Sequence, residues 1–505
     1  MDKKFFFVML ILPLILVIYG CGGSGGGGNA EPTPSVAPTS SPTVSPSPTD
    51  TPTPSPSPTS SPVGLEYEES FFGVFNSHDH DAYGPFKEWV GLDEQGFYDW
   101  ADYHQSVLKF HWSRTNTELV WDVVEPDFDG NYVWNNFMDA DDNIAAFRKT
   151  GQVNLWLVIE GNRRDGNRWQ DNKEKFQAYV RACVERYDGD GIDDAPGSPT
   201  VKYWQALNER GMGGATTADQ QISIEDYITY VTWMEEAVHD SDPEAKIILV
   251  AQAPLNDEIH SDMKEIIDGL MSAGVPFDIV DMHSWGPCQN WQMPEIADAR
   301  EYLDSRGLTN VQLWSGENGT WIGQPGNAME PQTEEQQAIF LAKRYAYGPS
   351  VGLSKLFWNN LCEWYNFAGR PDSQFNSMGL VGDGHCNGED PSRLNKPRVA
   401  YYAYSMLSSA IDRPENEYVG VMSITDNNNI YGYEYREKST GKSKFILWRE
   451  SGESEVTFGV SSDSVLVTNL ITDLEGNIQY QETISAKDGE VTLNVAEDPL
   501  LVVEQ

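Results

Sequence analysis

Positive charge is scarce in this sequence. Its 505 residues include 34 Lys and Arg but 77 Asp and Glu, which gives a formal net charge of -43 at pH 7. A surface this acidic repels nucleic acid and anionic membranes, so we expect no nucleic-acid partner and no direct binding to a membrane surface. The acidity is typical of a protein that its charge keeps soluble.

Cysteine is scarce too, and two kinds of catalytic motif are missing. The chain has five cysteines, and the spacings of Cys183, Cys288, Cys362 and Cys386 do not match a zinc site. In an oxidising compartment four cysteines allow three pairings, and we favour Cys362 with Cys386 because both lie in one segment. The chain has no Gly-rich phosphate loop and no His/Asp metal cluster. We therefore expect no phosphate chemistry, no metal-dependent hydrolysis and no cofactor.

A hydrophobic run stands at the N-terminus, where FFFVMLILPLILVIYG follows MDKK. It ends at a small residue before Cys21, as a secretory signal does. The sequence Ile-Tyr-Gly-Cys resembles a bacterial lipobox, which implies cleavage and the attachment of lipid to Cys21. We expect residues 1–21 to be this signal. The protein would then be extracytoplasmic and held on a bacterial membrane or cell surface only by its lipid anchor, with ordinary cleaved secretion as the alternative.

Residues 22–62 consist almost wholly of Gly, Pro, Ser and Thr. Such a composition cannot bury enough apolar surface to fold. Its Pro-rich part is expected to be extended and solvated. We interpret the segment as a disordered tether that holds a folded unit away from a membrane.

Between residues 63 and 410, short apolar runs alternate with longer amphipathic stretches, as in a parallel sheet built from βα units. The runs cover residues 70–77, 106–113, 152–161, 201–209, 246–253, 277–286, 310–319 and 354–360. Residues 172–187 and 224–240 have apolar positions three and four apart, which indicates helices. Eight such units predict an α/β fold, a closed (β/α)8 barrel of the TIM type.

The pattern changes in residues 411–505. Short alternating runs with β-branched residues are separated by turn sequences, and they read IYGYEYRE, SKFILWRE, SEVTFGVSS, SVLVTNLITD and GEVTLNVAED. This is typical of antiparallel strands, and we expect a C-terminal antiparallel β-sandwich. We expect this domain to pack against the barrel, with sugar binding as the alternative role.

Active sites of such barrels lie at the C-terminal ends of the strands. The residues that close the predicted strands are Asn76, His78, Asp79, Trp112, Arg114, Glu160, Asn208, Glu209, His283, Trp285, Glu317, Asn318, Trp358 and Asn359. Trp285, Trp321 and Trp364 stand in loops on this face, where exposed rings suit stacking on sugars. We expect Trp156 and Trp204 to pack in the barrel core instead.

Two of these residues, Glu209 after the fourth run and Glu317 after the seventh, suit the cleavage of a glycosidic bond. One carboxylic acid protonates the departing oxygen, while the other, ionised, attacks the anomeric carbon. A separation of roughly 5 Å gives retention through a covalent intermediate. Glu160 also ends a run, and we expect it to support the site or bind substrate rather than react.

The sequences YWQALNER and LWSGENGTW, three strands apart, resemble the acid/base and nucleophile motifs of the clan A glycoside hydrolases. That clan carries Asn-Glu after strand four and Glu after strand seven of a (β/α)8 barrel. The passage at residues 118–144, the sequence MHSW at strand six and Trp358 at strand eight are also similar to the clan. The resemblance covers roughly residues 65–505 and extends to families thirty-nine, thirty, five and fifty-one.

The resemblance implies a role for each matching residue. Glu209 would be the general acid/base and Glu317 the nucleophile. Asn208 would hold the sugar 2-hydroxyl, His283 would line the first subsite and Trp358 would form its floor. Further substrate contacts are expected from Asn76, Arg114, Glu160 and Trp285.

Some details of the resemblance stay open. Arg114 would be the strand-two cation that keeps the nucleophile ionised, but His111 or Trp112 could face the site in its place. Arg210 follows the acid/base where many members have Pro, and SGENG lacks the Thr-Glu that is common before the nucleophile. These departures bear on the exact family and not on the clan.

The stretch DGDGIDD at residues 188–194 is similar to a calcium loop, in which Asp188, Asp190 and Asp193 would donate oxygens. It does not match the spacing of an EF-hand. The alternatives are a structural calcium ion and a solvated acidic loop.

These observations predict a retaining glycoside hydrolase with a carbohydrate substrate. It would cleave β-glycosidic or α-L-arabinosidic bonds of an extracellular oligo- or polysaccharide by a two-glutamate double displacement. One alternative is a catalytically inactive carbohydrate-binding surface lipoprotein, against which the intact glutamate pair argues. The other is a transglycosylase that remodels exopolysaccharide with the same residues.

Overall fold

The computed structural model describes most of the chain beyond the predicted tether. The described residues are 65, 67–78, 84–115, 119–135, 140–149, 153–161, 163, 165–210, 222–252, 259–326, 329–364, 373–385, 391–424 and 429–505. The predicted signal with Cys21, the tether at 22–62 and Cys386 lie outside these residues. Those predictions, and the pairing of Cys362 with Cys386, stay predictions.

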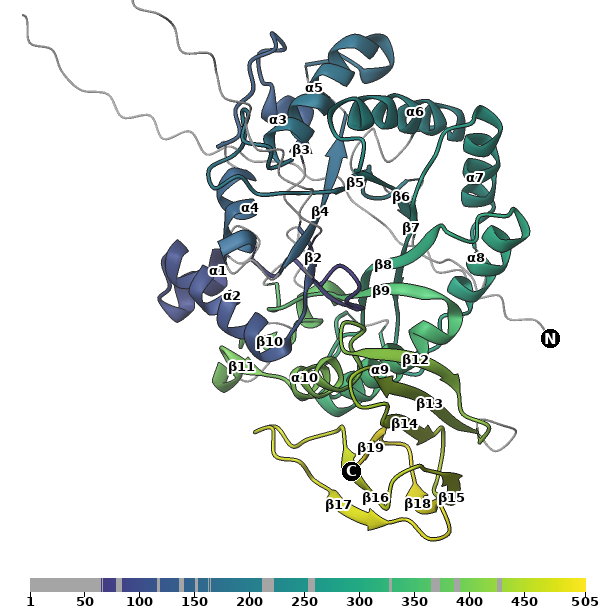
Figure 1. Cartoon of the computed structure of the whole chain (residues 1–505). Coiled ribbons are helices and arrows are strands. Elements are labelled where there is room, and N and C mark those ends of the chain that lie inside the picture. The colour runs from purple at the N-terminus through teal and green to yellow at the C-terminus, as the bar shows by residue number, and fades with distance from the viewer. Residues whose placement is uncertain are drawn as a thin grey trace, which may run out of the picture.

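Eight parallel strands form a closed barrel (Figure 1). They are β1 (Phe72–Phe75), β2 (Trp112–Arg114), β4 (Asn154–Glu160), β5 (Tyr203–Ala206), β6 (Lys246–Gln252), β7 (Ile279–Trp285), β8 (Gln312–Gly319) and β9 (Leu353–Trp358). Strand β1 pairs with both β2 and β9, and β2 pairs with β4, so the sheet closes on itself. The short β3 (Leu119–Val120) adds to β4. All eight predicted strands are confirmed.

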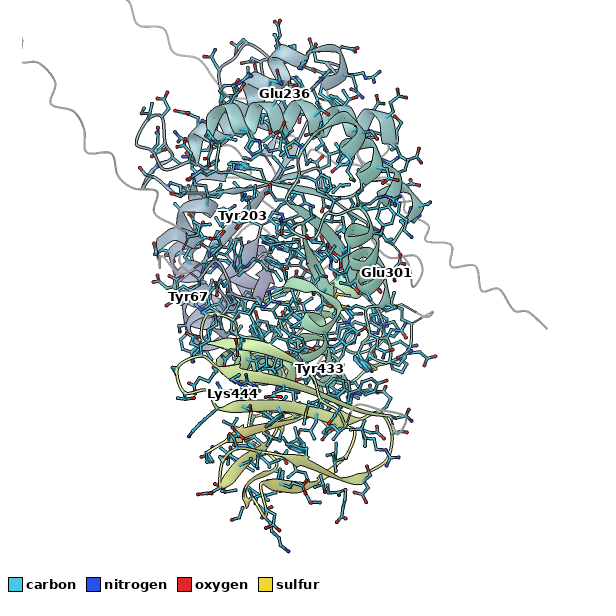
Figure 2. All side chains as sticks on the ribbon, turned by 45° about the vertical axis from the view of Figure 1, so that its right-hand side comes forward. Tyr67, Tyr203, Glu236, Glu301, Tyr433 and Lys444 are labelled. Carbon is cyan, nitrogen blue, oxygen red and sulfur yellow. The ribbon has the colours of Figure 1, made fainter. Side chains whose placement is uncertain are left out.

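Helices surround the barrel, as the alternating pattern predicts. They are α1 (Gly84–Val90), α2 (Glu94–Leu108), α3 (Trp121–Val124), α4 (Ala140–Lys149), α5 (Lys173–Arg186), α6 (Ile224–Ser241), α7 (Ser261–Ala273), α8 (Pro294–Ser305), α9 (Glu334–Tyr347) and α10 (Val399–Ile411). Single 3-10 turns cover Trp169–Asp171, Gly348–Val351, Gln374–Ser377 and Pro391–Arg393. The helices predicted at 172–187 and 224–240 are α5 and α6. Acidic side chains such as Glu236 and Glu301 lie on the outer faces of these helices (Figure 2).

One predicted strand begins too early. Residues 106–108 belong to the last turn of α2, so the strand run at 106–113 is shorter than predicted. The helix continues to Leu108. It ends there because Lys109 takes a left-handed conformation, with φ of 54°. A left-handed residue after the last turn is a common end of a helix.

The barrel interior is filled by large apolar side chains. This inner cluster consists of Trp112, Trp156, Val158, Tyr203, Ile248, Ile279, Trp314 and Phe357. Trp204 is also fully buried, in the layer between strands and helices. The expectation that Trp156 and Trp204 are core residues is confirmed. Strands buried on both faces explain why their sequences read as continuous apolar runs.

The C-terminal part forms antiparallel sheets. A six-stranded sheet has the order β12 (Asn416–Val421), β13 (Ile430–Glu437), β14 (Ser443–Arg449), β19 (Leu500–Glu504), β16 (Ser464–Asn469) and β17 (Gln481–Ser485). A second sheet pairs β15 (Ser454–Gly459) with β18 (Glu490–Val495). Earlier in the chain, before α10, the short β10 (Val381–Gly382) pairs with β11 (Lys396–Pro397). The rings of Phe445 and Phe458 meet between the first two sheets, with centroids 5.1 Å apart. The sequence did not predict β12, β17 and β19.

The six-stranded sheet packs on the barrel helices. Trp448 of β14 lies edge-on to Trp291, with ring centroids 5.1 Å apart. Beside them the ammonium group of Lys343, from α9, lies 3.2 Å from the carboxylate of Glu450. One apolar cluster runs from the barrel into this sheet, so the two parts share a core. None of the helices in the described part of the chain is long and apolar enough to cross a membrane.

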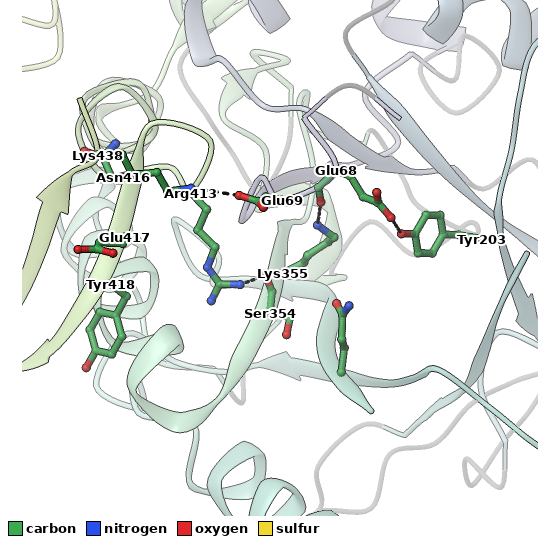
Figure 3. Close-up of a pocket in the computed structure, with 11 residues that line it drawn as sticks. Glu68, Glu69, Tyr203, Ser354, Lys355, Arg413, Asn416, Glu417, Tyr418 and Lys438 are labelled. Carbon is green, nitrogen blue, oxygen red and sulfur yellow. Dashed lines mark hydrogen bonds and ion pairs between the residues drawn. The ribbon is translucent and has the colours of Figure 1, made fainter. Parts of the chain in front are cut away.

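A cavity of about 610 Å³ lies between the starts of the barrel strands and the C-terminal sheets (Figure 3). Tyr203 at the start of β5 donates a hydrogen bond to Glu68, and Lys355 of β9 donates to the carbonyl of Glu68. Burial lowers the pKa of Lys355 to about 7. Because Glu209 and Glu317 lie at the opposite, C-terminal ends of their strands, this cavity is not the predicted active site.

Candidate active site

The two predicted catalytic glutamates lie side by side at the C-terminal ends of the barrel strands. Glu209 comes three residues after β5, and Glu317 lies near the end of β8. A carboxylate oxygen of each lies within 4.8 Å of the other and of a ring nitrogen of His283. Glu317 is largely buried, while Glu209 is partly exposed. The pair therefore has one shielded and one more accessible carboxyl group.

Arg114, the last residue of β2, is the cation beside Glu317. Its Nη1 donates to Oε1 of Glu317 at 2.7 Å, and its Nη2 donates to Oδ1 of Asn208. The guanidinium is buried, and a buried, directed ion pair of this kind stabilises a carboxylate more than a surface pair does. Of the residues that the sequence left as alternatives, His111 stacks on Tyr67 and Trp112 packs in the barrel core. Arg114 is thus the strand-two residue that reaches Glu317.

His283 lies between the two glutamates. Its Nδ1 is 2.7 Å from Oε1 of Glu209 and 3.6 Å from Oε1 of Glu317. Its Nε2 is 3.2 Å from Oδ2 of Asp281. The ring is fully buried, so it acts within the site's wall and not as an open sugar-binding surface.

The charge of His283 follows from these neighbours. Burial alone lowers the pKa of a histidine, but the negative charges of Glu317 and Asp281 and the hydrogen bonds to Asp281 and Glu209 raise it by more. The net effect raises the pKa of His283 from 6.5 to about 10. An imidazolium is therefore the stable form of this ring at neutral pH.

Glu160 and Asn76 occupy the ends of neighbouring strands. Oε1 of Glu160, the last residue of β4, accepts a hydrogen bond from the backbone N–H of Asn208 at 3.3 Å. Glu160 therefore holds the backbone just before Glu209, and its contact with substrate stays a prediction. Asn76 follows β1 and is fully buried, and its backbone N–H donates to the carbonyl of Arg114 at 2.8 Å.

The tryptophans of this face are less exposed than the sequence suggests. Trp358 is fully buried, and its Nε1 donates to the carbonyl of Met378 at 2.9 Å, so its ring forms no open floor. Trp321 and Trp364 are also buried, which corrects the expectation of exposed rings for stacking. Nε1 of Trp321 donates to the carbonyl of Glu330 at 3.0 Å, and the ring of Trp364 packs against Phe75. Trp285 is partly exposed and lies edge-on to Phe375.

The structure adds residues that the sequence analysis missed. Asp281 and Gln205 are buried under the site, and Nε2 of Gln205 donates to Oδ2 of Asp281 at 3.1 Å. Oε1 of Gln205 accepts from Nε1 of Trp156 at 2.9 Å. A signal was present for Asp281, because residues two apart in a strand point to the same side. Asp281 stands two residues before His283 and shares its face.

Among the described residues, two clusters of ligand atoms could hold a metal ion. In the first, formed by Glu209, His283 and Glu317, a bound cation would face the Arg114 guanidinium, which disfavours it electrostatically. The second brings together Asp188, Asp190 and Asp194. Asp193, which the sequence proposed as a ligand, is outside that group, and its carbonyl accepts a hydrogen bond from Arg186. A calcium ion at this loop stays a prediction.

Known structures share the fold. An α-L-arabinofuranosidase from Thermotoga maritima matches with a TM-score of 0.58 and 13% identity over 86% of this chain and 96% of that chain. A GH39 β-xylosidase from Caulobacter crescentus matches at 0.55 and 11% over 88% and 98%, and a GH30 endoxylanase from Clostridium papyrosolvens at 0.51 and 12% over 88% and 98%. No protein-family model and no curated protein matches the sequence. The chain therefore has the barrel fold of these clan A glycosidases.

Proposed function

We propose that the protein is a retaining glycoside hydrolase, with Glu317 as the nucleophile and Glu209 as the general acid/base. The observation that carries the proposal is the approach of the two carboxylates to within 4.8 Å at the ends of β5 and β8. Carboxyl groups about 5 Å apart suit double displacement, whereas inverting enzymes need a wider gap for a water molecule. The fold that the chain shares with glycosidases supports the same conclusion.

In the first step Glu317 attacks the anomeric carbon and Glu209 donates its proton to the departing glycosidic oxygen. A glycosyl ester forms on Glu317, and the alcohol leaves. Arg114 neutralises the charge of Glu317 before attack and holds Asn208 by its carbonyl oxygen. The amide nitrogen of Asn208 is then the end of that side chain that can donate to a sugar hydroxyl.

In the second step Glu209, now ionised, takes a proton from water, and the resulting hydroxide attacks the glycosyl ester. The bond between sugar and Glu317 breaks, so both carboxyl groups return to their starting forms. The imidazolium of His283 lies beside both glutamates. Its positive charge offsets the negative charge that moves from one glutamate to the other during the cycle.

The substrate class in this proposal is a β-glycoside or an α-L-arabinoside of an oligo- or polysaccharide. The neighbours in fold include arabinofuranosidases, a xylosidase and an endoxylanase, which supports arabinosides and xylosides as the substrates to test first. We further propose that the chain is a lipid-anchored extracytoplasmic protein and that its C-terminal sheets form a β-sandwich. The shared cluster around Phe445 and Phe458 supports the sandwich.

The test uses 4-nitrophenyl glycosides, with α-L-arabinofuranoside, β-D-xylopyranoside and β-D-glucopyranoside as the first three. Glu317→Ala should lower turnover by roughly 10⁴-fold or more, because the covalent step is lost. Glu209→Ala should still form the glycosyl-enzyme from these activated substrates and should be rescued by azide. Glu301→Gln, an exposed position on α8, is the matched control and should have wild-type activity.

Each alternative has its own outcome. Unchanged turnover in Glu317→Ala would overturn the nucleophile assignment, and absence of azide rescue would count against Glu209 as the acid/base. Binding without hydrolysis across a broad glycan panel would identify a carbohydrate-binding protein. Transfer of the sugar to added acceptors in preference to water would identify a transglycosylase.

A further inference from the structure

Asp281 is a buried carboxylate that the two glutamate roles do not use. Its Oδ1 accepts from the backbone N–H of Gly316 at 2.7 Å. Its Oδ2 accepts from Gln205 at 3.1 Å and lies 3.2 Å from Nε2 of His283. A buried charge is costly unless it is paired and hydrogen-bonded. Here every partner comes from the strands that carry the proposed active site.

The bond from Gly316 bears on the nucleophile. Strands β7 and β8 pair Asp281 with Trp314 and His283 with Glu317, so β8 has one extra residue between these two points. Such a β-bulge re-aims the side chains that follow it. The N–H of Gly316 lies inside this bulge and is bound by Asp281. The carboxylate therefore stabilises the bulge that directs Glu317 into the site.

The bond from His283 bears on the acid/base. Nδ1 of the ring is 2.7 Å from Glu209 and Nε2 is 3.2 Å from Asp281. A neutral imidazole can donate from only one of its nitrogens. Where the facing oxygens of Glu209 and Asp281 both accept from the ring, both ring nitrogens carry protons.

Charged side chains surround the ring of His283. The charged and titratable groups that face it or stand behind it are Asp281, Glu209 and Glu317, Arg114 bound to Glu317, and Arg210 and Tyr227 behind β5 and β6. Negative charges predominate next to the ring. Removal of one of these negative charges therefore makes the second proton of the His283 ring easier to lose.

We infer that Asp281 is a positioning residue of the active site, which holds the acid/base through His283 and the nucleophile through Gly316. The catalytic consequence rests on the proposed function, while the geometry does not. Because Nδ1–H of His283 donates to Oε1 of Glu209, the catalytic proton of Glu209 resides on Oε2. Asp281 thus determines which oxygen of the acid/base faces the glycosidic bond.

The first measurement needs no substrate. The ¹⁵N chemical shifts of the histidine rings are followed by NMR in the full chain from pH 5 to 9, with His283 assigned by its loss in His283→Gln. We expect both ring nitrogens of His283 to stay protonated over this range in the wild type. In Asp281→Asn the ring should become neutral within it. A wild-type ring that is neutral at pH 7 would overturn the inference, and this result is readable even where Asp281→Asn fails to fold.

The second measurement is the pH profile of kcat/KM on a 4-nitrophenyl glycoside. Asn at position 281 keeps the size of the side chain and can still accept from Gly316, so mainly the charge is lost. We expect the alkaline limb to move to lower pH by at least about one unit, with kcat reduced more than KM is changed. A profile of unchanged shape, lowered uniformly, would show that Asp281 is only structural.

The matched control is Asp102→Asn. Oδ1 of Asp102 lies 3.0 Å from Nε2 of His78, a second fully buried histidine, whose Nδ1 faces the hydroxyl of Ser77 rather than a glutamate. This variant should lose stability to a similar extent and keep the wild-type alkaline limb. An equal shift of the limb in both variants would overturn the inference. If the wild type hydrolyses no glycoside, the proposed function fails, while the ring titration still decides the role of Asp281.

Discussion

Arg210, the residue after the proposed acid/base, forms an ion pair with Asp262: its Nη1 lies 3.0 Å from Oδ2 of the carboxylate. Arg210 is buried, and Asp262 stands in the first turn of α7. The pair ties the segment that carries Glu209 to the helix that follows the next strand. This contact explains why a long cation occupies a position where clan A sequences often have Pro.

Loss of this ion pair should weaken the acid/base step. In Arg210→Ala, Glu209 is less firmly placed, and a small displacement of a catalytic group can cost 10- to about 100-fold in rate. We expect kcat to fall by about that factor for glycosides with poor leaving groups, and much less for good ones, which need no protonation. The measurement is kcat for a series of aryl glycosides whose leaving groups differ in pKa. Asp262→Ala, which removes the other partner of the ion pair, should show the same dependence on the leaving group. An equal loss for all leaving groups would contradict the assignment.

Arg114 should not be replaceable by lysine. Its guanidinium donates to Glu317 and Asn208 at once, and an ammonium group cannot span both acceptors with the same geometry. Arg114→Lys should lower kcat/KM by about 100-fold, the usual cost of one lost directed donor, although the charge is kept. Steady-state kinetics with an aryl glycoside check this. Lys264→Arg, on the outer helix α7, should be neutral.

The pH dependence of stability should carry the signature of His283. Its pKa is raised from 6.5 to about 10 in the folded state. The stabilisation it contributes is therefore fully present below pH 6.5 and is lost as the pH rises to about 10. The difference in free energy of unfolding between the wild type and His283→Gln should shrink over that window, as measured by denaturant titration.

A second histidine provides a control of opposite sign. Burial lowers the pKa of His104 to about 4. Its unfolded form therefore takes up a proton before its folded form does, so the wild type loses stability relative to His104→Gln as the pH falls from 6.5 to 4. Equal pH slopes for both variants would contradict the two assignments.

Gly316 should tolerate no side chain. An added Cβ would meet Trp156 at 2.3 Å and the oxygens of Asp281 at 2.8 and 2.9 Å. Gly316→Ala should cost about 1–3 kcal/mol of stability and most of the activity, because the bulge before Glu317 must shift. Gly286→Ala is the matched control, since its nearest atom lies at 3.8 Å. Thermal unfolding and kinetics of both variants decide the point.

The barrel and the C-terminal sheets should unfold together. Trp448 is fully buried against Trp291 in the shared cluster. Trp448→Ala should lower the free energy of unfolding by about 3–5 kcal/mol. It should also lower the temperature of the single unfolding transition that calorimetry records. Two separate transitions in the wild type would contradict a shared core. Tyr480→Ala, at an exposed ring, should leave the transition in place.

Much of the barrel was predictable from the sequence because strand identity is a local property. Each strand that is buried on both faces is apolar along its length, and each helix has apolar residues three and four positions apart. The eight units could therefore be counted without a structure. The count places Glu209 and Glu317 at the same end of the barrel. The strands β12, β17 and β19 were missed: β12 is exposed at every second position, β17 is exposed at most of its positions, and β19 is a run of only five residues.

The sequence by itself determined the order of the strands and which residues stand at their ends, because both follow from periodicity along the chain. The tertiary structure alone decided that Arg114 rather than His111 reaches Glu317, that Trp358 is covered, and that Asp281 holds His283 and Gly316. These facts depend on contacts between segments far apart in the chain, where a bulge of one residue changes the direction of a side chain. No local pattern records such contacts, since burial and partners arise only when the barrel closes.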